Sequence, residues 1–331
     1  MRILTDNQIQ KFKNFIDNHT SFIVIGHKEP DGDCIASSLG VATILNKMDK
    51  PCQLVSAGPF KRTELKDFEK HFTREATVLH TGSVGLIIVD CGEFKRIGEV
   101  FPPDSLITDA HSIDTFVIDH HKTSNPESDA FIIEPDSPAT AYLVQQLYEG
   151  IIGPLEKETA EILFLGLATD TGYFRFLEEG SGDVFHAAAR MVDAQVSPRV
   201  TYDVITRGKS FNTRKLLGIM LERAEQKFNG RLILTYETLE DTRKYGGDGR
   251  DSDSLYQLLL SCADVEAVVF IRQETDFGCT MGFRSRDTID VSAVASVFGG
   301  GGHKNAAGCS TPGKIEELTP KVLQEFEKIF S

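Results

Sequence analysis

Three short apolar runs place the tightest limit on how this chain folds. They are Phe22–Ile25, Leu86–Val89 and Phe116–Ile118, and none of them has a polar face. Strands that are buried on both sides have this composition, which is typical of parallel sheets. Between the first two runs, apolar residues from 35 to 48 recur at helical spacing. The alternation predicts an α/β fold, in which a parallel sheet carries helices on both faces.

The C-terminal part of the chain has a different pattern. From about 181 to 215 the sequence is helical in period and gives no strand signal. Beyond it, the predicted strands are Arg231–Tyr236, Val265–Arg272 and Cys279–Phe283, and the predicted helices are Ser254–Cys262, Val291–Phe298 and Ile315–Phe330. A chain of 331 residues has room for two domains. We therefore predict an N-terminal α/β domain over residues 1–185, a helical linker over 186–216 and a smaller α+β domain over 217–331.

Charge and cysteine content narrow the classes of partner and the location. The formal net charge is −14, which argues against a protein that coats long nucleic acid. A small phosphate substrate, whose charge is met locally, remains compatible with it. The six cysteines form no CxxC pair, as is typical of reduced thiols in a cytoplasmic protein. The N-terminus lacks the apolar core of a signal peptide, and no run is long enough to cross a membrane.

Acidic and histidine residues follow the apolar runs. His27, Asp31 and Asp33 come after the first run, Asp90 after the second, Asp119, His120 and His121 after the third, and Asp170 after the apolar segment Ile162–Ala168. We interpret that segment as a fourth strand end. Because the carboxyl ends of parallel strands meet at one edge of a sheet, these side chains are expected to converge on one crevice.

A convergence of carboxylates needs a cation. Carboxylates within a few ångströms of one another repel, and divalent ions remove that cost. Nitrogen and oxygen ligands together suit Mn²⁺ or a neighbouring first-row metal. Six candidate ligands are too many for one catalytic zinc, and they suit two ions that share a bridging carboxylate and activate a water. The six are His27, Asp31, Asp33, Asp90, His120 and Asp170.

Each cluster taken alone has an ordinary structural explanation. Asp33 could cap the helix that follows it, Asp90 could be a loop acid, and the pair His120-His121 could be solvated. Four such coincidences together favour the metal site. The pair Ser137-Pro138 predicts the N-cap and first turn of a helix, and we give Ser137–Thr140 a packing role only.

A glycine run near the C-terminus predicts an anion site. Gly299–Gly302 carries no side chains, so that backbone N–H groups can approach a ligand, and His303 follows directly. Arg284 and Arg286 lie near the end of a predicted strand upstream and suit a phosphate. The alternative is a flexible surface loop. The predicted substrate-binding residues are Arg284, Arg286, Gly300, Gly301, Gly302 and His303.

The motifs resemble those of a known superfamily. Four segments look like the four motifs of DHH phosphoesterases: His27-x-x-Pro30-Asp31-Gly32-Asp33, Val89-Asp90, Asp119-His120-His121 and Gly166-x-x-x-Asp170-Thr171-Gly172-x-Phe174-Arg175-Phe176. A fifth segment resembles the signature of the DHHA1 domain: Gly299-Gly300-Gly301-Gly302-His303-x-x-Ala306-Ala307-Gly308. The resemblance runs through almost the whole chain and is closest to the stand-alone nano-RNase type. One departure is Ala36, where many members carry glycine.

The resemblance implies an activity and a role for each site residue. His27, Asp31 and Asp90 would hold one Mn²⁺; Asp33, Asp90, His120 and Asp170 would hold a second; His121 would face the substrate as proton donor or electrostatic partner; Asp119 would orient a histidine. Other divalent cations stay possible. The implied reactions are hydrolysis of very short RNA, including linear dinucleotides, and of 3′-phosphoadenosine 5′-phosphate (pAp).

Related activities within the superfamily stay open. A soluble cyclic dinucleotide phosphodiesterase would share these motifs, whereas pyrophosphatases resemble the chain poorly after the linker, and long-strand exonucleases carry extra domains. A nucleotide-binding regulator without activity would be expected to have lost a ligand, and none of the six is missing. The sequence leaves open the polarity of cleavage, the metal bound in the cell and the oligomeric state, for which a homodimer is one alternative.

Overall fold

The computed structural model describes residues 3–77, 82–101, 113–246, 250–286 and 289–330. The chain forms two compact units, Met1–Gly208 and Lys209–Ser331. The segment predicted as a linker over 186–216 is helical, and its helices are divided between the two units.

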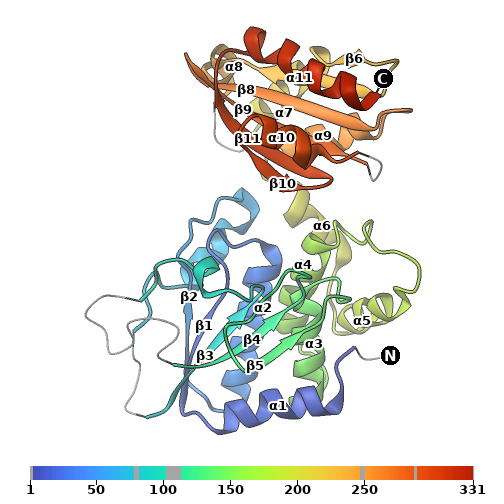
Figure 1. Ribbon diagram of the computed structural model, residues 1–331. Helices are drawn as coiled ribbons and strands as arrows, with labels where there is room; N and C mark the ends of the chain where they lie inside the picture. The colour runs from blue at the N-terminus through green and yellow to red at the C-terminus, as the bar shows by residue number, and fades with distance from the viewer. Residues whose placement is uncertain (1–2, 78–81, 102–112, 247–249, 287–288, 331) are drawn as a thin grey trace. The chain divides into compact units, whose positions relative to one another are not determined.

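The first unit is built on a parallel sheet, shown in Figure 1. Its strands are β1 (Ser21–Ile25), β2 (Cys52–Val55), β3 (Val84–Val89), β4 (Asp114–Asp119) and β5 (Ala130–Ile133). They lie in the order β2-β1-β3-β4-β5, and every neighbouring pair is parallel. The predicted α/β class and the three predicted strands are confirmed.

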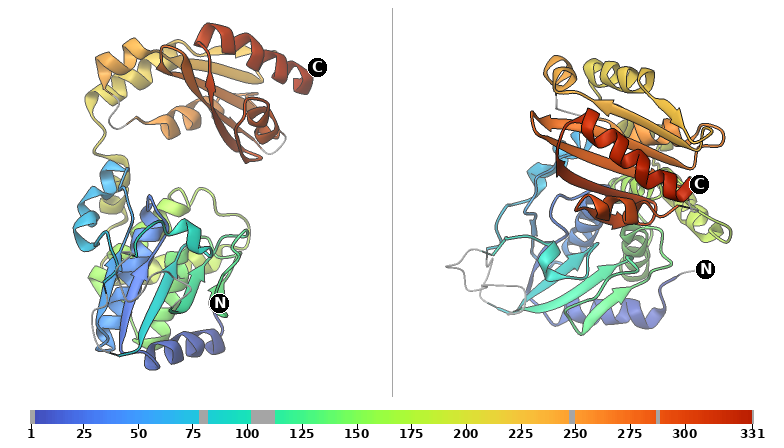
Figure 2. Two further views of the ribbon diagram at one scale, coloured as in Figure 1. Left: turned by 60° about the vertical axis from the view of Figure 1, so that its left-hand side comes forward. Right: turned by 45° about the horizontal axis from the view of Figure 1, so that its top comes forward.

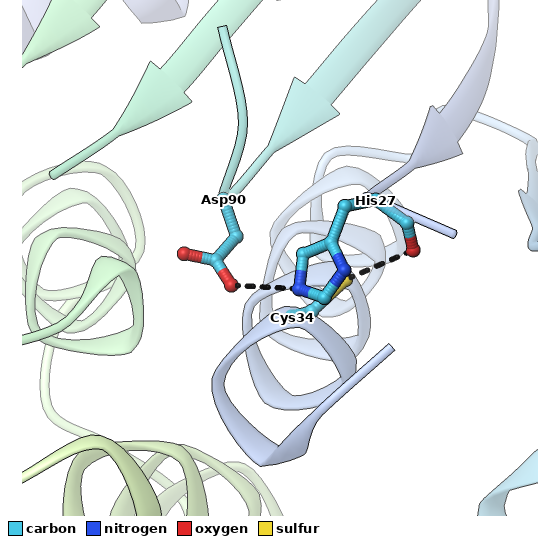
Figure 3. Close-up of side chains that lie close together, drawn as sticks. All are labelled: His27, Cys34 and Asp90. Carbon is cyan, nitrogen blue, oxygen red and sulfur yellow. Dashed lines mark hydrogen bonds and ion pairs between the residues drawn. The ribbon is translucent and has the colours of Figure 1, made fainter. Parts of the chain in front are cut away.

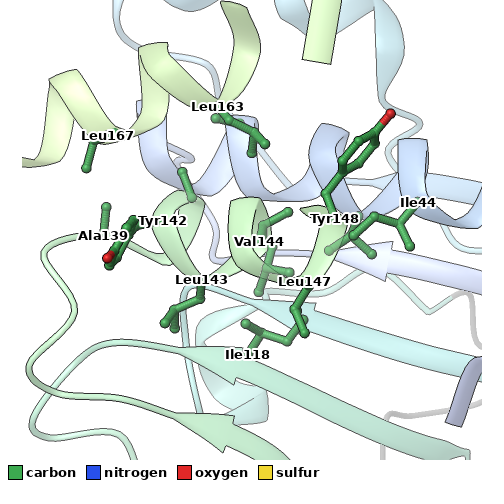
Figure 4. Packing of buried hydrophobic residues seen from close by; sticks show 14 of the residues in the cluster. Ile44, Ile118, Ala139, Tyr142, Leu143, Val144, Leu147, Tyr148, Leu163 and Leu167 are labelled. Atoms are coloured by element: carbon green, nitrogen blue, oxygen red, sulfur yellow. The ribbon is translucent and has the colours of Figure 1, made fainter. Parts of the chain in front are cut away.

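Helices cover the sheet because its strands are apolar on both faces. The helices of this unit are α1 (Asp6–Asp17), α2 (Gly32–Lys47), α3 (Thr140–Ile151), α4 (Lys157–Asp170), α5 (Gly182–Asp193) and α6 (Pro198–Thr206), with the 3₁₀ helices η1 (Thr63–His71) and η2 (Phe94–Arg96). Helices α1 to α4 pack on one face, where Leu143 and Leu147 of α3 lie over Ile118 of β4 (Figure 4). On the other face, Ile25 and Ile88 pack against η2 and its flanking segments.

The strand order creates a place for a ligand. After β1 the chain moves to β2 on one side, and it then returns to β3 on the other side of β1. At such a reversal, the loops that leave the two central strands diverge and open a crevice at the carboxyl edge of the sheet. His27 follows β1 and Asp90 follows β3, so both lie at this point.

Two local predictions in this unit were wrong. Helix α3 begins at Thr140, and its N-cap is Ala139 rather than Ser137. The segment Ile162–Ala168 belongs to helix α4, and Asp170 is the last residue of that helix rather than a residue after a strand. Helix α4 is buried along most of its length, and a short apolar run does not distinguish a buried helix from a buried strand.

The second unit is a mixed sheet with helices on both faces. Its strands are β6 (Glu225–Lys227), β7 (Leu232–Glu237), β8 (Ala267–Thr275), β9 (Gly278–Ser285), β10 (Gly301–His303) and β11 (Ala306–Pro312), in the order β10-β11-β9-β8-β7-β6. Its helices are α7 (Phe211–Glu222), α8 (Leu239–Tyr245), α9 (Ser252–Leu260), α10 (Val291–Val297) and α11 (Ile315–Phe330). Helices α10 and α11 cover one face and α7 and α9 the other (Figure 2). The predicted α+β architecture is confirmed.

In the described parts of the chain, no helix is both long enough and apolar enough to span a membrane.

Candidate metal centre and phosphate pocket

The first half of the centre lies where β1 leads into α2. The Oδ1 atom of Asp31 accepts hydrogen bonds from the N–H groups of Asp33 and Cys34, both at 3.1 Å, and so caps α2. The ring of His27 is fixed by a 2.9 Å hydrogen bond from Nδ1 to the Lys28 carbonyl oxygen. Because a carbonyl oxygen only accepts, Nδ1 carries the proton, and the Nε2 lone pair is free for a metal.

The second half is arranged around His120 in the same way. Its Nδ1 donates to the Ser137 carbonyl oxygen at 3.0 Å, which again leaves Nε2 as the metal-binding atom. Three carboxylate oxygens face that Nε2, from Asp170 at 3.3 Å, Asp90 at 3.7 Å and Asp33 at 3.8 Å. One nitrogen and three carboxylates therefore meet at this point.

Asp90 lies between the two halves. Its Oδ2 is 3.5 Å from Nε2 of His27 (Figure 3), and its Oδ1 is 3.7 Å from Nε2 of His120. The residue adopts a left-handed φ of 62°, and its N–H donates to the Ile118 carbonyl oxygen at 2.9 Å. This turn directs a buried carboxylate into the crevice with one oxygen toward each histidine. A carboxylate placed in this way fits a bridge between two cations.

The electrostatics of the centre also fit a cation. Burial, together with repulsion from Asp90 and Asp170, raises the pKa of Asp33 well above its ordinary value. Burial and repulsion from Asp90 and Asp31 raise the pKa of Asp170 to about 6, although His120 opposes the shift. Divalent ions would remove this repulsion, and the imidazole and carboxylate donors suit Mn²⁺ among the first-row metals.

Cys34 is close to the first half and was not predicted from the sequence. Its Sγ, a ring nitrogen of His27 and a carboxylate oxygen of Asp90 all lie within 4.8 Å of one another (Figure 3). Burial raises the pKa of this thiol to about 11, which favours the neutral form. The thiol contacts the His27 carbonyl oxygen at 3.9 Å.

Residues at the start of α3 hold two of the carboxylates. The hydroxyl of Thr140, which is fully buried, donates to Asp90 Oδ1 at 2.9 Å. The N–H groups of Thr140 and Ala141 donate to the two oxygens of Asp33 at 2.7 and 2.8 Å. Asp33 therefore caps α3, whose own N-cap residue Ala139 offers no side-chain acceptor. Thr140 therefore does more than the packing that we predicted for Ser137–Thr140, because it also donates a hydrogen bond to Asp90. The sequence does not reveal this contact, since a threonine at the start of a helix gives no signal for it.

Replacing Thr140 with Val is expected to weaken Mn²⁺ binding by about 10- to 100-fold, because the bridging carboxylate loses the donor that orients it. Isothermal titration calorimetry measures the affinity, and Thr140→Ser, which keeps the hydroxyl, is expected to bind nearly as the parent does. Thr235→Val is a matched control in the second unit, because Thr235 is also fully buried and donates to the Met220 carbonyl oxygen. An equal loss of affinity in that control would contradict the orienting role.

His121 and Asp119 form a separate pair beside Asp90. Nδ1 of His121 is 2.7 Å from Oδ1 of Asp119, which also accepts the backbone N–H groups of His120 and His121. The hydrogen bond to Asp119 raises the pKa of His121, against the opposing effect of burial. The contact fixes the ring and leaves Nε2 available to a ligand.

The second unit contains a cavity of about 380 Å³ beside β9 and β11. It is lined by Ser252, Tyr256, Phe270, Arg272, Thr280, Met281, Gly282, Arg284, Gly301, Ala306, Ala307 and Gly308. The Arg284 guanidinium lies 4.7 Å from the ring centroid of Tyr256. Two arginines in one cavity suit a phosphate. Arg272 and Tyr256 were not predicted, since nothing in a strand or helix pattern shows which side chains share a cavity.

The predicted substrate-binding residues are not all brought together. Arg284 and Gly301 line the cavity, whereas the Arg286 guanidinium donates to the Leu260 carbonyl oxygen at 2.7 Å. His303 is exposed on β10 and is absent from the described lining. The alternative of a flexible surface loop is wrong for residues 301–303, because they form a strand that pairs with β11.

Close approach to β11 explains two of the glycines. A Cβ atom at Gly300 would lie 2.2 Å from the Gly308 carbonyl oxygen, and one at Gly302 would lie 2.5 Å from that of Ala306. A Cβ atom at Gly301 would have no neighbour within 4 Å. Gly301 therefore lines the cavity at a position with room for a side chain. Gly300 and Gly302 have to be glycine because the backbone of β11 lies too close for a Cβ atom.

Two family models match successive parts of the chain. Residues 21–167 match the N-terminal domain of the DHH family, and residues 233–331 match the DHHA1 domain. The chain is 28% identical over 304 residues to the bifunctional oligoribonuclease and PAP phosphatase NrnA of Thermus thermophilus, covering 90% of this chain and 86% of the relative. It is 26% identical to the cyclic-di-AMP phosphodiesterase PdeA of Listeria monocytogenes, covering 90% of this chain and 46% of that protein.

A solved structure shares the fold of the whole chain. The crystal structure of an exopolyphosphatase-related protein from Bacteroides fragilis matches with a TM-score of 0.84 at 23% identity, covering 100% of this chain and 99% of that one. Both family domains occur in the expected order, each within one of the two compact units. The chain therefore carries an N-terminal domain of the DHH family, followed by a DHHA1 domain.

Proposed function

We propose that this hydrolase of phosphoester bonds uses two Mn²⁺ ions to cleave very short RNA to mononucleotides and to convert pAp to AMP and phosphate. The observation that carries the proposal is Asp90, whose two oxygens face the metal-binding atoms of two different histidines. A single-ion site has no use for such a carboxylate. The relationship to NrnA, named as an oligoribonuclease and PAP phosphatase, supports the choice of substrates.

The residues of the centre would have two roles, which are to hold the ions and to donate a proton. His27, Asp31 and Asp90 would hold one ion, and Asp33, Asp90, His120 and Asp170 the other. When bound, the ions lower the pKa of a water and offset charge on the phosphoryl oxygens. His121, with its ring fixed by Asp119, presents Nε2 and gives a proton to the leaving oxygen.

The second unit would supply a second anion site. Arg272 and Arg284 line its cavity together with Gly301. Both pAp and a linear dinucleotide such as pApA carry a phosphate besides the reacting one, and a phosphate is the group that two arginines recognise. A pyrophosphate ion would leave the cavity in the second unit with little to hold. The net charge of −14 would repel a long strand outside the two sites.

The substrate class is tested with purified protein, Mn²⁺ and a panel of pAp, di- to pentanucleotides, a long oligonucleotide, cyclic dinucleotides and pyrophosphate. We expect turnover to be highest for pAp and dinucleotides and to fall steeply as the strand lengthens. Equal rates on a dinucleotide and on the long strand, or preference for pyrophosphate, would contradict the proposal. A preference for cyclic over linear dinucleotides would favour the alternative that the likeness to PdeA raises.

Arg284→Ala is expected to raise the KM for nucleotides by about tenfold or more with little change in kcat, because the guanidinium binds substrate away from the reacting atoms. Steady-state kinetics on a dinucleotide measures both constants. Arg286→Ala is the comparison, since Arg286 is not among the described residues that line the cavity, and this variant is expected to change KM less. A collapse of kcat at unchanged KM in Arg284→Ala would contradict a division of labour between the two units.

A further inference from the structure

The loop that follows Asp170 has an unusual backbone. Gly172, Tyr173 and Phe174 have φ angles of 56°, 59° and 70°, so three successive residues are left-handed, and two of them are aromatic. This conformation is unfavourable for bulky side chains and persists only where the surroundings impose it. Such residues gather at ligand sites.

Hydrogen bonds impose the conformation. The buried hydroxyl of Thr171 donates to the Leu167 carbonyl oxygen at 2.6 Å and accepts the Phe174 N–H at 3.0 Å. The Thr171 carbonyl oxygen accepts the Phe176 N–H at 3.1 Å, and the Tyr173 hydroxyl donates to the Pro198 carbonyl oxygen. The loop is thus tied to the end of α4, the helix that carries Asp170.

The fixed loop presents one aromatic ring to solvent. Phe176 is 62% exposed. Its ring lies against Gly172, where a Cβ atom would come within 2.4 Å of it, and Gly172 is two residues from Asp170. The Arg175 guanidinium lies 4.6 Å from the ring centroid and, among the described residues, forms no ion pair. The loop that leaves Asp170 therefore carries an exposed aromatic face and, among the described residues, a cation without an ion pair.

We propose that Phe176 and Arg175 form a nucleobase platform. The base next to the reacting phosphate stacks on the Phe176 ring, and Arg175 moves off the ring to pair with a phosphate of the same nucleotide. A base and a phosphate are the two groups that a ring and a guanidinium recognise side by side. This inference rests on the proposed function and adds a subsite to it. Stacking accepts any base, so that base identity is expected to matter little.

The test compares two linear dinucleotides that have the same sugars and phosphates. One carries both bases, and the other is abasic at both positions. Phe176→Leu keeps the apolar bulk and removes the aromatic face. We expect it to raise the KM for the normal dinucleotide by about tenfold, with kcat within about twofold, and to leave the KM for the abasic one unchanged. Phe176→Tyr is expected to restore the parent KM. Arg175→Gln is expected to raise the KM for both substrates.

A matched control exists in the same unit. Phe131 on β5 is 40% exposed and has the Lys11 ammonium 5.0 Å from its ring centroid. Phe131→Leu is expected to leave both KM values unchanged. An equal rise for the normal and abasic dinucleotides in Phe176→Leu, no rescue by Phe176→Tyr, or the same effect in Phe131→Leu would overturn the platform.

A second readout separates this inference from the proposed function. Stacking quenches the fluorescence of 2-aminopurine, so that a dinucleotide carrying it reports the contact without turnover. The measurement is made with Ca²⁺ in place of Mn²⁺, so that no turnover takes place. We expect the parent protein to quench the fluorescence and Phe176→Leu to lose the quenching. If the parent hydrolyses no dinucleotide, the proposed function is wrong. The platform is then supported if the parent quenches the fluorescence and Phe176→Leu does not, and it is contradicted otherwise.

Discussion

Asp90→Asn is expected to lower Mn²⁺-dependent hydrolysis by about 10³-fold or more, because a neutral amide cannot bridge two cations. Asparagine is the right replacement, since it tolerates the left-handed φ of 62° that Asp90 adopts, whereas alanine would add strain. The variant is expected to melt no lower than the parent in EDTA, because Asp90 is one source of the repulsion on Asp33 and Asp170. Turnover and thermal melting are measured on the same preparation.

Asp114→Asn is the control for this variant. Its side chain is 84% exposed at the start of β4, and its one described ion pair is with His19 at 3.4 Å. It is expected to keep its activity. Near-normal activity in Asp90→Asn would show that this carboxylate does not bridge, and a large fall in melting temperature would show that its main role is in the fold.

Gly300→Ala is expected to destabilise the second unit by about 2–3 kcal/mol, because the new methyl group would meet the backbone of β11. The overlapping atoms are the Gly308 carbonyl oxygen and Cβ of Cys309, at 2.2 and 2.3 Å, and neither is the end of a flexible side chain. Gly301→Ala meets no atom within 4 Å and is expected to cost less than about 1 kcal/mol. Denaturant unfolding of both variants gives the difference.

The same pair of variants also tests the cavity. Because Gly301 lines it, Gly301→Ala is expected to raise the KM for a dinucleotide while the protein stays folded. An unchanged KM would mean that substrate does not approach this strand, and the glycine run would then serve the hairpin alone. Equal unfolding free energies for the two alanine variants would contradict the packing argument.

Much of the centre could be predicted because it sits at strand ends. The apolar runs that lead into Asp90 and Asp119 predict the strands, and they also show that these two residues lie at the carboxyl ends of those strands. In a parallel sheet, the carboxyl ends lie at one edge. The structure brings His27, Asp90 and His120 together for that reason. The fold class followed from the same runs, since they are apolar on both faces.

The rest of the site depends on contacts between distant segments. Asp170 arrives from the end of a buried helix, and its apolar neighbours resemble those of a strand. Thr140 touches Asp90 across 50 positions of sequence. Arg272 joins Arg284 in one cavity because β8 pairs with β9 and directs both side chains to the same wall. None of these contacts leaves a local pattern, so that periodicity cannot reveal them.

The hydrogen bonds that Asp33 accepts from α3 change how other sequences of this family are read. A relative that had given up hydrolysis but kept alanine at position 139 would still need an acceptor at position 33, because the first N–H groups of α3 are buried there and alanine cannot serve them. An aspartate retained at that position is thus a poor marker of an active enzyme. His27 and Asp90 cap no helix in the described structure, so that a change at either one is the clearer sign of a chain that has stopped hydrolysing.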